Sequence, residues 1–87
     1  MRPLKKRPEI VIYMELLGLL REGPRGPTRL AQALGLSYDR FARLASILEE
    51  RKFIVNEAAE SYTQYRITPE GVQLHQDWTS VKDRLGY

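Results

Sequence analysis

A chain of 87 residues with a net charge of +3 is long enough for one small domain. Such a domain buries only about 60% of its unfolded surface, so a partner copy would add stability. With no cysteine and one histidine, the chain has no means of forming disulfides or thiolate metal sites and too few histidines for a zinc site. The lack of cysteine fits a reducing compartment.

Residues 1–7 are predicted to form a disordered basic arm, because they are polar and have little apolar surface to bury. Two interpretations of this arm remain open. It is either a solubilising tail or a segment that touches phosphates or the minor groove of DNA. The basic residues of the arm are Arg2, Lys5, Lys6 and Arg7.

The segment 8–22 predicts a helix, with Pro8 at its first position and Glu9 near the positive end of the helix dipole. Its apolar residues cover two sides, so one side faces the core and the other needs the C-terminal helix or a second subunit. Glu9 and Glu15 interrupt the apolar run, which is too short to span a bilayer and lacks a signal-peptide cleavage site.

Residues 27–46 predict two short helices joined by a tight turn, which is the helix-turn-helix arrangement. Gly35 follows the first helix, where a residue that tolerates positive φ is favoured, and Ser37 can cap the second. The second helix is predicted over residues 38–51. Its apolar face consists of Phe41, Leu44, Ala45 and Leu48.

A β-hairpin is predicted after this second helix. Residues 53–55 are β-branched and aromatic, residues 56–61 are polar and turn-like, and residues 62–67 form the returning strand. A hairpin in this position is the wing of a winged helix. The connector 25–27 is a candidate for a further, very short strand.

A last helix begins with Thr68 as its cap and Pro69 at its first position. Its apolar residues recur as in a coiled-coil seam. The seam consists of Leu74, Trp78, Val81 and Leu85. It packs either on its own domain, against the first helix, or on a second copy of the chain. A tryptophan exposed on so small a domain favours the dimer.

Three segments carry a resemblance to a known family: GPTRL at 26–30, LSYDR at 36–40 and YRITPEG at 65–71. With them, nearly the whole chain from Pro8 resembles the small archaeal winged-helix DNA-binding proteins. That family has chromatin-associated and regulator-like members, and some dimerise through a C-terminal antiparallel coiled coil. The resemblance implies a mainly α fold with a β-hairpin: a winged helix-turn-helix domain at 8–68 and a dimerisation helix at 69–87.

By position, the resemblance implies that residues 27–29 meet the DNA backbone and that the corner 37–40, with Arg43, faces the major groove. Double-stranded DNA and a second copy of the chain are the expected partners. The predicted DNA-binding residues are Thr28, Arg29, Ser37, Tyr38, Asp39, Arg40, Arg43 and Ser46.

Arg43 is the main candidate for reading a base edge, because a guanidinium can bond O6 and N7 of guanine together. Its alternative role is a solvated charge paired with Glu50 or Asp39. Arg29 and Arg40 are expected to contact phosphates, which position the protein without specifying a sequence.

The predicted function is a DNA-binding protein, either a transcription regulator or a chromatin protein, located in the cytoplasm with the nucleoid. It would place helix 38–51 in the major groove as a homodimer. The predicted wing turn carries the acidic residues Glu57 and Glu60 and no lysine or arginine. This favours an alternative function, a protein-interaction module without strong DNA binding. No nucleophile, phosphate loop or metal-ligand pattern is present, so catalysis, a cofactor and a small-molecule substrate are not expected.

Overall fold

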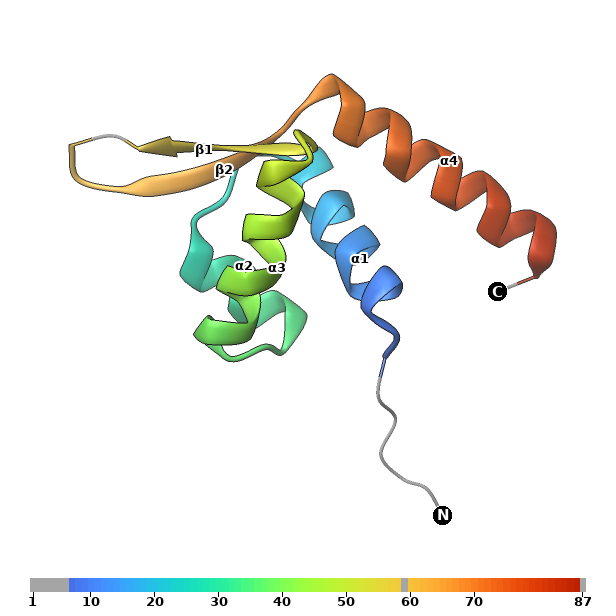
Figure 1. Ribbon diagram of the computed structural model, residues 1–87, viewed down its shortest axis with the longest axis horizontal. Helices are drawn as coiled ribbons and strands as arrows, with labels where there is room; N and C mark the ends of the chain where they lie inside the picture. Colours follow the sequence, from blue (N-terminus) through green and yellow to red (C-terminus); the bar gives the residue numbers. More distant parts are fainter. Residues whose placement is uncertain (1–6, 59, 87) are drawn as a thin grey trace, which may run out of the picture.

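Three helices, a two-stranded antiparallel hairpin and a fourth helix make up the protein, as seen in a computed structural model that describes residues 7–58 and 60–86. The hairpin projects to one side of the three-helix body and the last helix to the other (Figure 1). The predicted mainly α fold with a β-hairpin is confirmed. The elements are α1 (Glu9–Arg21), α2 (Pro27–Leu34), α3 (Tyr38–Glu50), β1 (Ile54–Ala58), β2 (Thr63–Ile67) and α4 (Pro69–Leu85).

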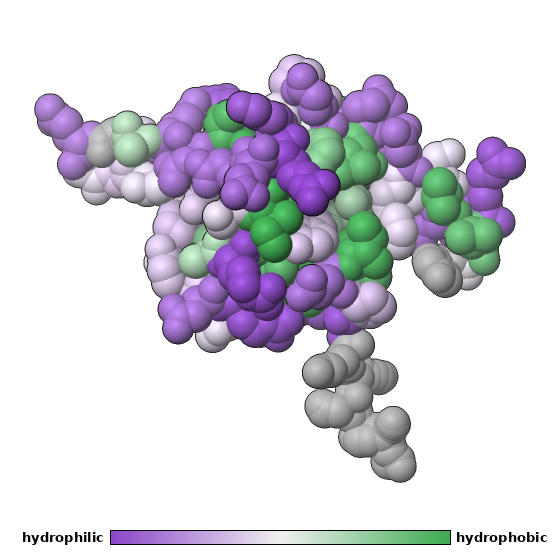
Figure 2. Space-filling model, viewed as in Figure 1, coloured by the Kyte–Doolittle hydropathy of each residue, from purple (hydrophilic) through white to green (hydrophobic). Residues whose placement is uncertain are grey.

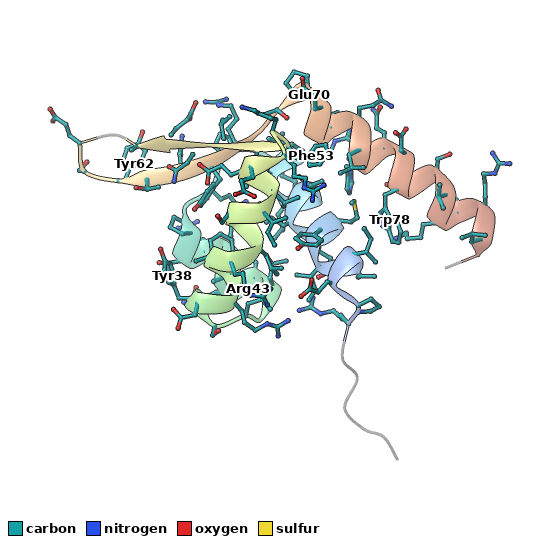
Figure 3. All side chains as sticks on the ribbon, viewed as in Figure 1. Tyr38, Arg43, Phe53, Tyr62, Glu70 and Trp78 are labelled. Atoms are coloured by element: carbon teal, nitrogen blue, oxygen red, sulfur yellow. The ribbon has the colours of Figure 1, made fainter. Side chains whose placement is uncertain are left out.

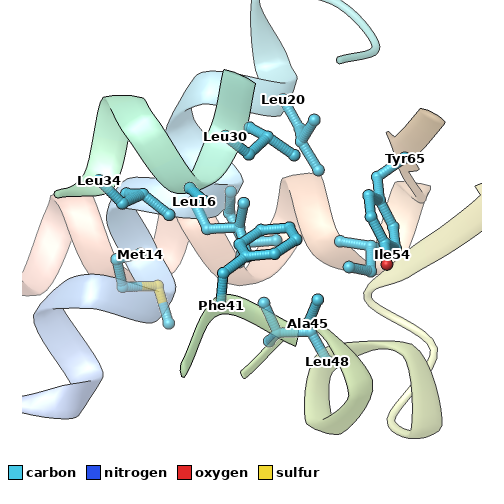
Figure 4. Packing of buried hydrophobic residues seen from close by; sticks show 12 residues of the cluster. Met14, Leu16, Leu20, Leu30, Leu34, Phe41, Ala45, Leu48, Ile54 and Tyr65 are labelled. Carbon is cyan, nitrogen blue, oxygen red and sulfur yellow. The ribbon is translucent and has the colours of Figure 1, made fainter. Parts of the chain in front are cut away.

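The core lies where α1, α2 and α3 meet the base of the hairpin (Figure 4). Phe41 of α3 packs edge-on against Tyr65 of β2, with ring centroids 5.8 Å apart and planes at 76°. Burial of each large apolar side chain contributes about 1.5–3 kcal/mol. Because this face of α3 is buried, the opposite face of the same helix is turned to solvent. The buried residues of α3 are Phe41, Leu44, Ala45 and Leu48.

The turn between α2 and α3 has the predicted capping geometry. Gly35 adopts φ 69°, and the N–H of Leu36 donates to the carbonyl of Ala31 at 2.9 Å, as in a Schellman motif. Ser37 Oγ accepts from the N–H of Arg40 at 3.2 Å, which caps α3. These bonds set the angle at which α3 leaves α2.

Strand β1 is longer than the sequence predicts, since it runs to Ala58 and the turn expected from Asn56 onward is wrong at its start. Strand β2 begins at Thr63, one residue later than predicted. Glu57 lies in β1 and accepts from Arg66 of β2 at 2.8 and 3.1 Å. These bonds from Arg66, then one from Gln64, hold the pKa of Glu57 below its usual value. Cross-strand pairs of this kind stabilise a strand whose own composition is turn-like.

The connector before α2 pairs with the hairpin, as the short-strand prediction expected. Arg25 donates its N–H to the carbonyl of Tyr65 at 3.2 Å, and the N–H of Tyr65 donates to the carbonyl of Arg25 at 2.8 Å. Gly26 precedes α2 as its cap residue, and Pro27 takes the first helical position. This pairing fixes the start of α2 against β2.

Helix α4 starts at the base of the hairpin, at a corner that hydrogen bonds of Thr68 hold in place. Thr68 Oγ1 accepts from the N–H of Gly71 at 3.0 Å, which confirms the predicted cap, and donates to the carbonyl of Lys52 at 2.7 Å. Gly71 is buried so close to Phe53 that a Cβ there would lie 2.2 Å from the Phe53 carbonyl oxygen. A side chain at position 71 is therefore incompatible with this corner.

The C-terminal seam is divided by the fold. Leu74 and Trp78 are partly buried against the core of their own domain, and Trp78 projects from α4 toward α1 (Figure 3). Val81 and Leu85 are 47% and 65% exposed, and Figure 2 shows apolar surface on the outer half of α4. The first half of the seam thus packs within the chain, while the second half stays uncovered.

Within residues 7–58 and 60–86, none of the helices combines the length and the apolar character needed to cross a bilayer.

Candidate nucleic-acid interface

All eight residues of the predicted DNA-binding set are exposed. They come from the first turn of α2, the turn after it and the N-terminal part of α3, and α2 packs against α3. Tyr38, 58% exposed, and Arg43 both lie on the α3 segment in Figure 3. The solvent face of α3 therefore carries the side chains that the sequence analysis placed there.

Arg29 and Arg40 present open guanidinium groups, because neither side chain has an ion pair or hydrogen bond within the part of the chain that the structure describes. Arg43 differs, since its Nη2 lies 3.7 Å from Oε2 of Glu9. The sequence alone indicates Asp39 or Glu50 as the partner of Arg43, whereas the structure places Glu9 there. The N-terminus of α1 comes beside α3 only in the folded chain, so local spacing carries no signal for this pair.

Arg7, the last residue of the predicted arm, contacts the folded domain. It pairs with Glu15 of α1 and donates to the carbonyl of Leu34 at the end of α2. A cation beside the last carbonyl groups of a helix is favourable, because these groups carry the negative end of the helix dipole. The guanidinium of Arg7 thus has structural partners. The other three basic residues of the arm, Arg2, Lys5 and Lys6, lie outside the described residues.

A groove with a volume of about 340 Å³ separates α1 from α4. His75 Nδ1 lies 3.2 Å from Nη1 of Arg21 and accepts from it, because a guanidinium only donates. Burial, then the charges of Arg21 and Lys82, lower the pKa of His75. Gly18 leaves room for the imidazole, since a Cβ there would lie 3.1 Å from Nε2. His75 is therefore a packing residue between α1 and α4.

The part of the chain that the structure describes contains no group of three or more His, Cys, Asp or Glu residues that could hold a metal ion.

Solved structures with a similar fold include transcription regulators. MepR, a transcription regulator of the Staphylococcus aureus multidrug efflux pump MepA, aligns with a TM-score of 0.77 and 22% identity over 86% of this chain and 58% of its own. The transcriptional regulator BldR from Sulfolobus solfataricus aligns with a TM-score of 0.74 and 18% identity over 87% and 60%. A MepR–DNA complex from S. aureus aligns with a TM-score of 0.75 and 21% identity over 86% and 65%.

At these identities the likeness establishes the fold, and the chain spans about three fifths of the length of MepR and BldR. A search among curated proteins found no match. A family model described as winged helix-turn-helix matches residues 6–85, which is nearly the whole chain. The match covers the capped turn between α2 and α3, the hairpin after α3, and α4. The chain belongs to the winged helix-turn-helix family.

Proposed function

We propose that the protein binds double-stranded DNA as a homodimer, with α3 in the major groove, and serves as a transcription regulator or a chromatin protein. The observation that carries this proposal is the exposure of every predicted contact residue on α2, α3 and the turn between them. The inner face of α3 is buried, so its outer face is held rigidly for docking. The MepR–DNA complex, which has a similar fold, adds support.

Each side chain has a role that follows from its chemistry. Arg43 reads a guanine edge through its two-pronged guanidinium, and Asp39 accepts from a cytosine amine. Arg29 and Arg40, whose guanidinium groups are open, bind phosphates and fix the position of α3 on the duplex. Ser37 is already engaged as the cap of α3, so a phosphate contact is secondary for it.

The wing contributes little positive charge to this binding. Arg66 is bonded to Glu57, and the hairpin turn adds the exposed acid Glu60. Tyr62 and Val55 are exposed on the same hairpin. A hairpin with neutralised charge and exposed apolar side chains is the specific feature that favours the second candidate function, a protein-interaction module.

Titration of random and genomic duplexes at several salt concentrations tests the proposal. The two phosphate-binding arginines of each copy, Arg29 and Arg40, predict a slope of log K against log salt of about −2 for one copy and about −4 for two. Tighter binding to particular genomic fragments would indicate a regulator, and equal binding to all fragments would indicate a chromatin protein. Weak binding that is independent of duplex length, together with a co-purifying protein, would support the interaction module instead.

We infer that two copies associate through the outer half of α4. A shallow groove there is lined by Asp77, Ser80, Val81, Arg84 and Leu85. Asp77 and Arg84 are seven residues apart on one face, so antiparallel helices related by a two-fold axis can place each Asp77 opposite Arg84 of the other copy. Such a face is self-complementary, and it covers the exposed Val81 and Leu85.

Leu85→Glu is expected to give monomers by light scattering, with helix content retained, because a charge would be buried between the two copies. Leu85 suits this test better than Trp78, which also packs on its own core. Val55→Glu, the same kind of change on the exposed hairpin, should leave the dimer intact. A wild-type monomer, or a dimeric Leu85→Glu variant, contradicts this interface.

A further inference from the structure

Arg43, the residue proposed to read a base edge, is the one arginine of Arg29, Arg40 and Arg43 that is held by a carboxylate within the described residues. Its Nη2 lies 3.7 Å from Oε2 of Glu9, and both side chains are about half exposed. Arg29 and Arg40 have no acidic partner in the same part of the chain. The three arginines of the proposed DNA-binding surface therefore differ in how freely they can bind DNA, because Glu9 pairs with Arg43 alone.

The fold itself holds Glu9 beside α3. Glu9 is the first residue of α1, where a carboxylate is favoured by the positive end of the helix dipole. Arg7, two residues earlier, binds Glu15 of α1 and the carbonyl of Leu34 in α2, which ties this end of α1 to the helix-turn-helix. Glu9 thus stays beside the N-terminal part of α3 whether or not Arg43 is bound to DNA.

We propose that Glu9 competes with DNA for Arg43 and thereby sets the affinity of the interface. A guanidinium that bonds O6 and N7 of guanine uses the donors that otherwise face Glu9, so docking breaks the pair. The pair is exposed, so its cost to binding is modest: Glu9 tunes binding and does not block it. This inference rests on the proposed DNA binding.

A double-mutant cycle tests the competition by measuring the duplex dissociation constant of four proteins: wild type, Glu9→Gln, Arg43→Gln and the double variant. Glu9→Gln keeps the shape of the side chain and removes its charge. It is expected to tighten binding by about two- to fivefold in the wild-type background, the range that an exposed ion pair allows. In the Arg43→Gln background the same change should leave the dissociation constant unchanged, because the guanidinium for which Glu9 and DNA compete is absent.

Glu22→Gln is the matched control. Glu22 is the C-cap of the same helix and pairs with Arg25 at 2.7 Å, so this variant also breaks an ion pair at an end of α1, but away from Arg43. It should leave the dissociation constant unchanged.

Three results would overturn the competition. Weaker binding by Glu9→Gln would mean that Glu9 positions Arg43 for DNA. Equal tightening in both backgrounds would mean that Glu9 repels the duplex without acting through Arg43. An unchanged affinity of Glu9→Gln, with normal wild-type binding, overturns this inference alone, whereas a wild-type protein that fails the salt titration overturns the proposed function itself.

Discussion

Gly71→Ala is expected to lower the free energy of unfolding by about 2–4 kcal/mol. The new Cβ would lie 2.2 Å from the carbonyl oxygen of Phe53 and 2.7 Å from Cγ1 of Ile67. Backbone oxygen has no free rotation by which to move aside, so α4 must shift away from the hairpin. Overpacking of this kind costs about 1–3 kcal/mol. The shift also strains the cap that Thr68 provides, which is worth about 1 kcal/mol.

Gly18→Ala is the matched comparison, because it adds the same methyl group at a helical glycine. There the nearest atom is Nε2 of His75 at 3.1 Å, at the end of a side chain that can turn. Alanine also gains up to about 1 kcal/mol of helix propensity over glycine. Urea denaturation should therefore show a clear loss of stability for Gly71→Ala and little change or a gain for Gly18→Ala. Equal midpoints for the two variants would contradict the tight corner at Gly71.

Arg40→Glu combined with Arg43→Glu is expected to weaken binding to duplex DNA by about 100-fold or more at low salt. Losing two contacts of about 1.5 kcal/mol each gives roughly 3 kcal/mol, and the new carboxylates add repulsion by phosphates. Both side chains are exposed, so the fold should survive the change. Fluorescence anisotropy with a labelled duplex measures the affinity, and circular dichroism checks the helix content.

Arg51→Glu combined with Lys52→Glu is the control for this variant. It makes the same change in charge at the other end of α3, in residues that are also exposed. Negative charge at a helix C-terminus costs about 0.3–1 kcal/mol of stability, which thermal unfolding can verify. DNA affinity should fall far less than for the Arg40/Arg43 variant. If both double variants lose the same affinity, net charge governs binding and the N-terminal part of α3 has no special role.

Local sequence signals predicted most of the fold. The apolar spacing of residues 41–48, the glycine at position 35 and the caps Ser37 and Thr68 act within one or two helical turns, so they can be read without the tertiary structure. The predicted apolar face of α3 is buried, and all of the contact residues that the resemblance implied are exposed. The prediction was wrong where β1 continues through Asn56 to Ala58.

Only the tertiary structure decided the contacts between segments that are distant in the chain. Arg66 from the returning strand gives Glu57 the partner that extends β1, and the start of α1 brings Glu9 to Arg43. The apolar seam of α4 was visible in the sequence, but its division into a half packed on α1 and the core and an exposed half was not. Helical periodicity shows that a face is apolar. Which surface covers that face depends on where the other elements lie in space.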